Sequence, residues 1–358
     1  MRRYLAGLAL LLVGCGKGER EPIVLAAAGG WSQSAGIMAQ RGVLLARDEL
    51  NADVGAPKVA IDFVDDSGNG RVAARVAQEL VDSVKYAAVI GHLTSGAMKA
   101  AAKVYDGRIA AVATAASSPE LTGISPWAFR VIASDSVSGI DIARYATRLG
   151  KRRAAILYEN SAYGRGLADA FRRNFAGEVI GVDPIGDSGD QDFEPYISWF
   201  KVRRPDLVFV AGTDKSGIAF VRAAREQKLG VDLMGGVGWR GVAVDTANAE
   251  GVWVGVPFSA EDDREDVRRF VQAFRARYGV TPDAGAALAY DATRAVAAAA
   301  RAVGPDRAKI RDWLAATGGG QGVAGVTGVV RFGPDGDPVG APSVMTRVQR
   351  GALVVAGR

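Results

Sequence analysis

The stretch AAVIGHLTSGAMKAAAKVY, residues 87–105, predicts how the chain folds. Its first part, Ala88–Gly91, is a short apolar run, typical of a strand that is buried on both faces of a sheet. Ser95 and Gly96 follow the strand, and a helix is predicted to begin near Ala97. A strand that leads directly into a helix is part of a β-α-β unit, so this stretch predicts a parallel sheet with right-handed crossovers.

The same alternation continues on both sides of this stretch. Apolar runs of strand length alternate with segments whose apolar residues recur every fourth position, the spacing of one helix face. The pattern starts again near residues 131–138, so two α/β halves of similar plan are predicted. The first half has strands at 23–28, 59–64, 87–90 and 109–114, and helices at 38–50 and over Val72, Val76, Leu80 and Val84. The second has strands at 154–158, 179–182, 207–211, 231–234 and 252–256, and helices at 166–175, 192–201 and 216–228.

The end of the chain has a different pattern. The turn residues of 334–338 and of Gln349–Gly351 separate short apolar runs, which predicts strands joined by tight turns. Helices are predicted at 263–278, 284–303 and 307–316, and strands at 329–332, 343–348 and 352–355.

Composition excludes several classes of protein. The 358 residues are 49% hydrophobic and 23% charged, which is the balance of a globular protein. The net charge of +5 is spread along the chain, and no basic stripe with interleaved aromatic residues appears, so no nucleic acid partner is predicted. The chain has one Cys and one His, which excludes an internal disulfide and any metal centre built from several of these residues.

The N-terminus is predicted to carry an export signal. In MRRYLAGLALLLVGC, two arginines precede the apolar run Leu5–Val13, which is too short to span a bilayer as a helix. Leu12-Val13-Gly14-Cys15 resembles the lipobox of bacterial lipoproteins, which implies that residues 1–14 are removed, that Cys15 is lipidated and that 15–22 form a tether. The alternatives are a plain secretory signal and an uncleaved anchor.

Enzyme motifs are mostly missing from the sequence. There is no Walker-type phosphate loop, no HExxH and no Gly-x-Ser-x-Gly. Gly164-Arg165-Gly166 is a fragment of a dinucleotide fingerprint, but Asp169 stands where the third glycine belongs and would repel a pyrophosphate. The lone His92 is expected to be structural rather than catalytic. No catalytic residue, metal or cofactor is therefore predicted, and an enzyme with a nucleotide cofactor is kept as the competing hypothesis.

Two turns of the first half suit an anionic group. Ser95 and Ser117 each follow a buried strand, and a helix N-terminus there presents free N–H groups and partial positive charge. Ala115 and Ala116 are small enough to let a ligand approach the backbone. The carboxyl ends of parallel strands are where ligands bind in such folds. The alternative is that both serines only cap helices.

Three residues elsewhere leave two interpretations open. Asp214 follows the strand at 207–211 and either contacts a ligand or complements the dipole of the next helix. Tyr163, in a polar loop, either stacks over a ligand or packs against the protein. Trp31, near the first turn from strand to helix, has the same two interpretations.

These segments together resemble the periplasmic solute-binding proteins of branched-chain amino acid ABC transporters. The resemblance covers nearly the whole chain in order. It rests on AQRGVLLARDELNA (39–52), IDFVDDSGN (61–69), AAVIGHLTSGAMKAAAKVY (87–105), SSPELT (117–122), FRVIASD (129–135), RRAAILYENSAYGRGLADAF (152–171), DF (192–193), PDLVFVAG (205–212), EGVWVG (250–255) and YDATRAV (290–296).

The resemblance implies a fold and an organisation. The fold is α/β, with two doubly wound parallel-sheet lobes joined by three crossover strands around one small ligand. The helices of 263–316 would return to the first lobe and the last strands to the second. The lobes would be 23–133 with 258–334, and 134–257 with 335–358.

The resemblance also implies ligand-binding positions. The ligand carboxylate would be held by the turn at Thr94-Ser95 and by Ala115-Ala116-Ser117. Tyr163 would close over the ligand from the second lobe. The acidic residue that holds the ammonium in the family aligns with Val237 here, and the family's aromatic residue aligns with Thr213. Either Asp214 replaces the missing carboxylate, or the ligand lacks an ammonium, as a carboxylic acid, an amide or a urea-like solute does. In that case Trp31, Trp239 and Tyr163 would favour a planar or apolar ligand body.

The expected function is that of a lipid-anchored receptor that closes on a small solute and delivers it to an ABC permease. A ligand-binding sensor of the same fold is the alternative that keeps this architecture.

Overall fold

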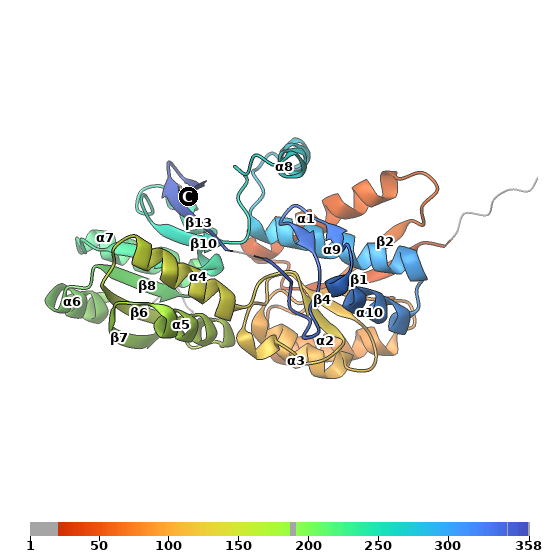
Figure 1. The fold of residues 1–358 in the computed structure, drawn as a ribbon, viewed down its shortest axis with the longest axis horizontal. Coiled ribbons are helices and arrows are strands. Elements are labelled where there is room, and N and C mark those ends of the chain that lie inside the picture. The colour runs from red at the N-terminus through yellow and green to blue at the C-terminus, as the bar shows by residue number, and fades with distance from the viewer. Residues whose placement is uncertain (1–20, 187–190, 342, 357–358) are drawn as a thin grey trace, which may run out of the picture.

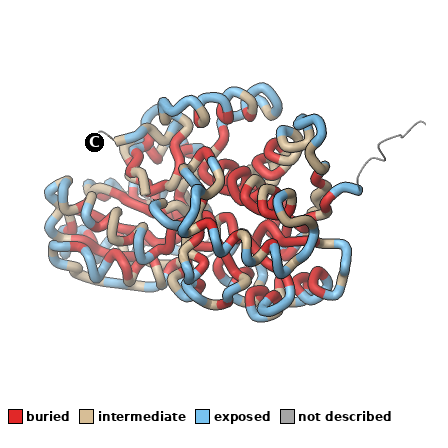
Figure 2. Tube along the Cα trace, turned by 45° about the vertical axis from the view of Figure 1, so that its right-hand side comes forward, coloured by how far each residue is buried: buried red, intermediate tan, exposed pale blue. Residues whose placement is uncertain are grey.

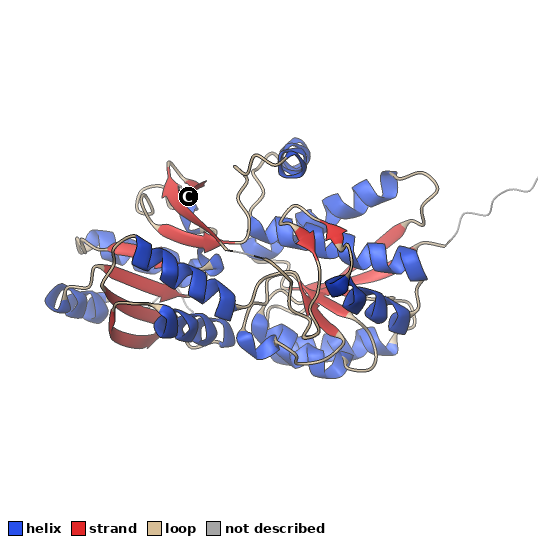
Figure 3. Ribbon diagram, viewed as in Figure 1, coloured by secondary structure: helices blue, strands red, loops and turns tan. Residues whose placement is uncertain are grey.

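Residues 21–186, 191–341 and 343–356 are described by a computed structural model. Two main sheets, each sandwiched between helices, form two lobes that lie side by side (Figures 1 and 3). The predicted signal peptide and Cys15 lie outside the described residues. None of the described helices combines the length and apolar character needed to cross a membrane.

The first lobe is built on a five-stranded parallel sheet in the order β2-β1-β3-β4-β5. Its strands are β1 (Ile23–Gly29), β2 (Val59–Asp65), β3 (Val89–Gly91), β4 (Ala111–Ala113) and β5 (Ala128–Arg130). The strands β1, β3, β4 and β5 are buried on both faces, as their apolar runs predict, whereas the edge strand β2 is mostly half-buried.

Helices from both ends of the chain cover this sheet. One face packs against helices from the early and the late part of the chain, α1 (Ser34–Ala52), α9 (Ala284–Val303) and α10 (Arg307–Ala316). The other packs against α2 (Gly70–Asp82) and α3 (Ser95–Tyr105). The short helix η1 (Pro119–Leu121), α8 (Glu265–Tyr278) and the hairpin of β11 (Val323–Ala324) and β12 (Val329–Val330) complete the lobe.

The second lobe has a seven-stranded sheet in the order β14-β13-β10-β9-β8-β6-β7. The last two strands of the chain are antiparallel and the rest are parallel. The strands are β6 (Arg153–Glu159), β7 (Glu178–Ile185), β8 (Leu207–Ala211), β9 (Asp232–Gly235), β10 (Trp253–Val256), β13 (Val344–Gln349) and β14 (Ala352–Val355), and the helices are α4 (Asp135–Arg148), α5 (Ala162–Asn174), α6 (Glu194–Arg203) and α7 (Asp214–Glu226).

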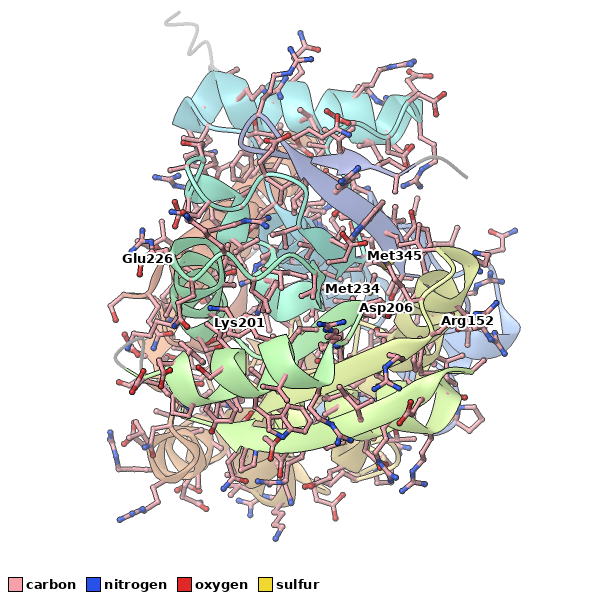
Figure 4. The ribbon with its side chains drawn as sticks, turned by 90° about the vertical axis from the view of Figure 1, so that its left-hand side faces the viewer. Arg152, Lys201, Asp206, Glu226, Met234 and Met345 are labelled. Atoms are coloured by element: carbon pink, nitrogen blue, oxygen red, sulfur yellow. The ribbon has the colours of Figure 1, made fainter. Side chains whose placement is uncertain are left out.

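Figure 4 views this lobe from its outer end. Met234 of β9 and Met345 of β13 are buried in the core between the sheet and helices α4 and α5. The Asp206 carboxylate accepts hydrogen bonds from the backbone N–H groups of Arg152 and Arg153 at 2.8 and 3.1 Å, which ties the starts of β6 and β8 together. The buried segments follow the two sheets in Figure 2.

The predicted fold class is confirmed. The chain passes between the lobes three times, after β5, after β10 and before β13, and the late helices return to the first sheet while the last strands join the second. The lobe boundaries themselves stay a prediction. Gly123 N–H donates to the Asp335 carbonyl at 2.9 Å and Arg130 pairs with Asp337 at 2.7 Å, so we propose that the last boundary follows Asp337 rather than residue 334.

Several local predictions differ from the structure, and two of them concern helices of the sheets' outer faces. Helix α2 ends at Asp82, so Val84 lies outside it and is fully exposed, whereas the periodicity predicts it on the buried face. Helix α4 falls where no helix is predicted. It begins after Ser134, whose hydroxyl accepts the N–H of Ser136, and it buries Ile142 against the sheet.

Candidate functional site

The two predicted turns of the first lobe lie side by side. Ser95 opens α3, and its hydroxyl accepts the backbone N–H of Ser118 at 3.1 Å. The N-cap of α3 is Thr94, which is exposed and accepts the N–H of Ala97 at 3.3 Å. Ser118 caps η1. The alternative that Ser95 and Ser117 are N-caps is therefore wrong, because their neighbours fill that role.

In the second turn, Ala115 is half-buried and Ala116 is fully buried. The Ser117 side chain is 1% exposed, and its hydroxyl has no hydrogen-bond partner among the described residues. The Ser117 hydroxyl adjoins the Asp135 carboxyl group, and its remaining hydrogen-bonding capacity is available to another group.

Asp135 adjoins Ser117 from the second lobe. Its backbone N–H donates to the Ser117 carbonyl at 2.7 Å. The side chain is 1% exposed, and neither carboxyl oxygen has a hydrogen-bond partner within the described parts of the chain. Burial raises the pKa of Asp135 to about 7, while the nearby Ser117 hydroxyl and the Arg130 charge act to lower it. Sequence reasoning missed this residue.

Tyr163 lies in the first turn of α5, not in a loop as predicted. The helix begins early because the Ser161 hydroxyl accepts the N–H of Gly164 at 3.0 Å and so caps it. Tyr163 is half-buried, and its hydroxyl accepts the Gly238 N–H at 3.0 Å. Burial raises the pKa of Tyr163, and the negative charge of Asp135 adds to the effect. Tyr163 thus links the carboxyl-end loops of β6 and β9.

Thr213 is exposed and is held by a buried carboxylate that sequence reasoning missed. Its N–H and its hydroxyl both donate to Glu159 Oε1, at 2.8 and 2.7 Å. Ser216 Oγ donates to the same oxygen at 2.7 Å. Glu159 is 2% exposed and ends β6, so this acid fixes the turn that follows β8.

Asp214 lies at the start of α7 and accepts the Gly241 N–H at 2.7 Å. Burial raises the pKa of Asp214, and the positive charge of Arg240 acts to lower it. Asp214 therefore holds the loop after β9.

Val237 and Arg240 bring the second lobe against the first. Val237 is half-buried and packs against apolar residues of the first lobe. Arg240 Nε lies 3.1 Å from Asp283 Oδ2, with side chains 10% and 25% exposed. Asp283 is the N-cap of α9 in the first lobe. Arg240 and Asp283 form an ion pair between the lobes that no local sequence pattern signals.

The two tryptophans are packing residues. The indole of Trp31 donates to the Val64 carbonyl at 2.9 Å and meets Phe63 edge to face at 5.2 Å between ring centroids. Trp31 is 9% exposed, so the packing interpretation holds for most of its surface. Trp239 is fully buried in the core of the second lobe, and its predicted part in favouring a planar ligand is wrong.

Helix α5 also touches the first lobe. A Cβ added at Gly166 would lie 2.5 Å from Pro119 Cδ, so the lobes meet closely at this point. A groove of about 430 Å³ runs beside this contact and is lined from both lobes by residues that include Ser118, Ser136, Ile140 and Arg165. None of the predicted ligand-binding residues lines this groove.

The features that kept an enzyme hypothesis open have structural roles. His92 Nδ1 lies 2.5 Å from Asp66 Oδ2 and His92 Nε2 lies 2.9 Å from the Tyr105 hydroxyl, all buried. A Cβ at Gly164 would lie 2.1 Å from the Glu159 carbonyl oxygen, so this glycine permits packing rather than phosphate binding. Within the described ranges no cluster of His, Cys, Asp and Glu could hold a metal ion.

The predicted positions thus converge at one edge of each sheet. Trp31, Thr94 and Ala115 follow β1, β3 and β4, and Tyr163, Thr213 and Val237 follow β6, β8 and β9. The carboxyl ends of parallel strands meet at the same edge, so these residues face the region between the lobes.

The two serines should respond differently to removal of their hydroxyls. Ser95→Ala leaves the buried N–H of Ser118 without its acceptor, so we expect the free energy of unfolding to fall by about 1–3 kcal/mol. Ser117→Ala removes only the influence of the hydroxyl on the neighbouring Asp135 carboxyl group, so stability should fall by less than in Ser95→Ala. If Ser117 binds a charged ligand group, its loss should weaken binding by roughly ten- to hundredfold.

Urea unfolding and titration calorimetry on both variants test this difference. A stability loss in Ser117→Ala as large as that in Ser95→Ala, with unchanged ligand affinity, would contradict a ligand-binding role for Ser117.

Residues 24–352 match the model of a family described as periplasmic binding protein. An amino acid binding protein of Pseudomonas aeruginosa is 29% identical and is matched over 82% of each chain. A Leu/Ile/Val-binding protein homolog 2 of Brucella abortus is 28% identical, over 89% of this chain and 88% of the relative.

Solved structures of the same architecture are similar over almost the whole chain. The branched-chain amino acid transporter substrate binding protein LivJ of Streptococcus pneumoniae, in complex with isoleucine, is 28% identical with a TM-score of 0.86, over 94% of this chain and 99% of that one. A solute binding protein of an ABC transporter from R. palustris, in complex with benzoate, has a TM-score of 0.85 over 94% and 96% of the chains, and at 21% identity it shows the fold alone.

Proposed function

Because the chain belongs to the periplasmic binding protein family, we propose that it is the solute-binding receptor of an ABC importer. It binds a small amino acid, or a related carboxylate or amide, between its lobes and delivers it to the permease. The observation that carries the proposal is the convergence of strand ends from both lobes on one interlobe region, where Arg240 and Asp283 pair across the boundary. The family is one of solute-binding receptors rather than enzymes, and it places the protein outside the cytoplasm.

The mechanism follows from the two lobes and needs no covalent step. A ligand that contacts both lobes stabilises the closed arrangement, because it binds this arrangement more tightly than the open one. The three interlobe crossings absorb the dihedral change as the lobes separate. The permease then receives the solute when the lobes open.

An amino acid is the ligand class that the relatives favour. The P. aeruginosa relative is named for amino acid binding, and the LivJ structure contains isoleucine. Ser95 and Ser117 supply hydroxyls, and the small residues Ala115 and Ala116 leave backbone groups accessible, which suits a carboxylate.

A ligand screen tests the proposed function. Thermal shifts are measured with amino acids, carboxylates, amides and aromatic acids, and a ligand at ~100 times its dissociation constant should stabilise the folded state by about 2.7 kcal/mol. A screen in which no small solute raises the midpoint would count against a receptor for such solutes.

We also propose that Cys15 is the lipidated N-terminus of the mature chain. It is the only cysteine, and it closes a lipobox-like sequence. We expect the wild type in the membrane fraction, with a diacylated Cys15 in its mass spectrum, and Cys15→Ser released from the membrane. An unmodified wild-type N-terminus at another residue would overturn the proposal.

A further inference from the structure

The only histidine of the chain connects three segments of the first lobe. His92 directly follows β3 and is fully buried. Its ring nitrogen Nδ1 lies 2.5 Å from Asp66 Oδ2, and Nε2 lies 2.9 Å from the Tyr105 hydroxyl. Asp66 follows β2 and Tyr105 ends α3, so groups from two other elements hold the ring on both sides.

These hydrogen bonds determine which ring nitrogen of His92 carries the proton. Burial raises the pKa of Tyr105, and the negative charge of Asp66 adds to the effect, so the tyrosine keeps its proton. The hydroxyl has no other partner in the described ranges, so it donates to Nε2. Nδ1 then carries the ring proton and donates it to Asp66. In this arrangement every polar atom of the ring and of the Tyr105 side chain is satisfied.

Asp66 also binds the loop that follows β2. Asp66 Oδ1 accepts the Gly68 N–H at 2.7 Å, and the Asp66 N–H donates to the Gly29 carbonyl at the end of β1 at 3.1 Å. The Gly68 carbonyl in turn accepts the Thr94 hydroxyl at 3.3 Å. Asp66 therefore holds together the carboxyl ends of β1, β2 and β3.

The residues after His92 form the turn that the resemblance assigns to the ligand carboxylate. Leu93 is half-buried and packs in the core on the other face of the sheet from Tyr105. Thr94 caps α3 and Ser95 opens it. Only Leu93 separates His92 from Thr94, so a fixed His92 ring fixes where the turn lies. A turn that is already held in place costs the ligand less ordering entropy on binding.

We propose that His92 is a positioning residue for ligand binding, whose hydrogen bond to Asp66 holds the turn at Thr94-Ser95 in its binding conformation. The inference rests on the proposed function, which assigns this turn to the ligand. His92 itself does not bind the ligand, because both ring nitrogens are bound by protein groups. The hydrogen bond to Tyr105 contributes to stability instead, since Tyr105 lies at the opposite end of α3 from the turn.

Nitrogen NMR tests the assignment on the wild type alone. Because the chain has one histidine, a long-range proton–nitrogen correlation spectrum of protein with isotope-labelled histidine shows a single imidazole ring. We expect Nδ1 to carry a proton near neutral pH. An unprotonated Nδ1 could not donate to Asp66 and would overturn the proposal.

Two amides of different length separate the two hydrogen bonds of His92. In His92→Asn the amide nitrogen takes the place of Nδ1 and can still donate to Asp66. In His92→Gln the amide lies further along the side chain, near the place of Nε2, and serves Tyr105 instead. Each variant keeps one hydrogen bond and loses the other, so a merely structural role would give the two variants the same ligand affinity.

Titration calorimetry with the standard amino acids and benzoate as probes measures this difference. For the tightest probe, we expect His92→Gln to bind at least about tenfold more weakly than the wild type, and His92→Asn to stay within about threefold. Tyr105→Phe is the matched control for the other hydrogen bond, and it should lose stability in urea but bind within about threefold of the wild type. If circular dichroism shows that His92→Gln does not fold, Asp66→Asn should lose about tenfold, since its single amide oxygen accepts only one of the two N–H groups.

Equal affinities of folded His92→Asn and His92→Gln would overturn the positioning role and leave the receptor function intact. A wild type that binds none of the probes would count against the proposed function, and amide hydrogen exchange then tests the positioning role without a ligand. The Ala97 N–H, which donates to the Thr94 hydroxyl, should exchange faster in His92→Gln than in the wild type and His92→Asn. Equal exchange in the three proteins would overturn the positioning role.

Discussion

Gly166→Leu is expected to lower ligand affinity by at least about 100-fold, or about 2.7 kcal/mol, without unfolding the protein. Gly166 lies on α5 of the second lobe, and even a Cβ there would approach Pro119 of the first lobe to 2.5 Å. A leucine side chain would hold the lobes apart, so the ligand would contact one lobe at a time. The ligand would then no longer stabilise the closed arrangement over the open one, and most of the binding free energy would be lost.

Gly230→Leu is the matched control for this variant. Gly230 is exposed in the same lobe, and nothing lies within 4 Å of a Cβ added there. Titration calorimetry should show wild-type affinity for Gly230→Leu. Small-angle scattering should show that ligand reduces the radius of gyration of the wild type and of the control, but not of Gly166→Leu. Tight binding by Gly166→Leu with normal compaction would show that closure does not depend on this contact.

Asp135→Asn is expected to make stability less dependent on pH. The folded pKa of Asp135 is about 7, above its ordinary value of 3.8, because burial disfavours the charged form. The folded state therefore holds more protons than the unfolded state between roughly pH 4 and pH 7, and wild-type stability falls as pH rises through this window. Asn cannot ionise, so the variant avoids a penalty of up to about 4 kcal/mol at pH 8 and gains little at pH 4.

Urea unfolding of the ligand-free proteins at pH 4.5 and pH 8 measures this effect. Tyr163 stays neutral over this range, since burial raises the pKa of Tyr163 above its usual value. Asp291, whose pKa burial raises to about 6, is present in both proteins and cancels in the difference. Equal differences between variant and wild type at the two pH values would show that Asp135 does not titrate in this window.

Strands buried on both faces were the most predictable part of the fold. The run Leu207–Ala211 is apolar throughout, and β8 has the same bounds. Helix α9 also has its predicted bounds, because both its capping residues and its Ala-rich interior favour a helix. Helix α4 was missed because its first residues, Asp135 to Gly139, include two serines and a glycine, and its stability comes from packing. Gly139 on α4 allows such a close approach to α5 that an added Cβ would lie 2.5 Å from Ala170 Cβ.

The site was predictable where it depends on topology. Residues that follow parallel strands meet at one sheet edge, which is why Thr94, Ala115 and Thr213 face the interlobe region. The charged side chains of this region were not predictable. Glu159 binds a turn 54 positions away, and Arg240 meets an acid 43 positions away, so neither pairing leaves a local pattern.

The interrupted course of the chain through its lobes has a consequence for biosynthesis. The sheet of the first lobe is complete once β5 is made, but α9 and α10, which cover one of its faces together with α1, end only at Val303 and Ala316. Arg307 donates to the carbonyl of Tyr86, a contact that spans 221 positions. Contacts this distant slow folding, because the intervening chain must first lose the entropy of loop closure, and only then do the contacts stabilise the fold. A growing chain therefore keeps apolar strands uncovered through most of its synthesis, which favours an unfolded, translocation-competent state and makes the nascent chain a substrate for chaperones that protect exposed apolar segments.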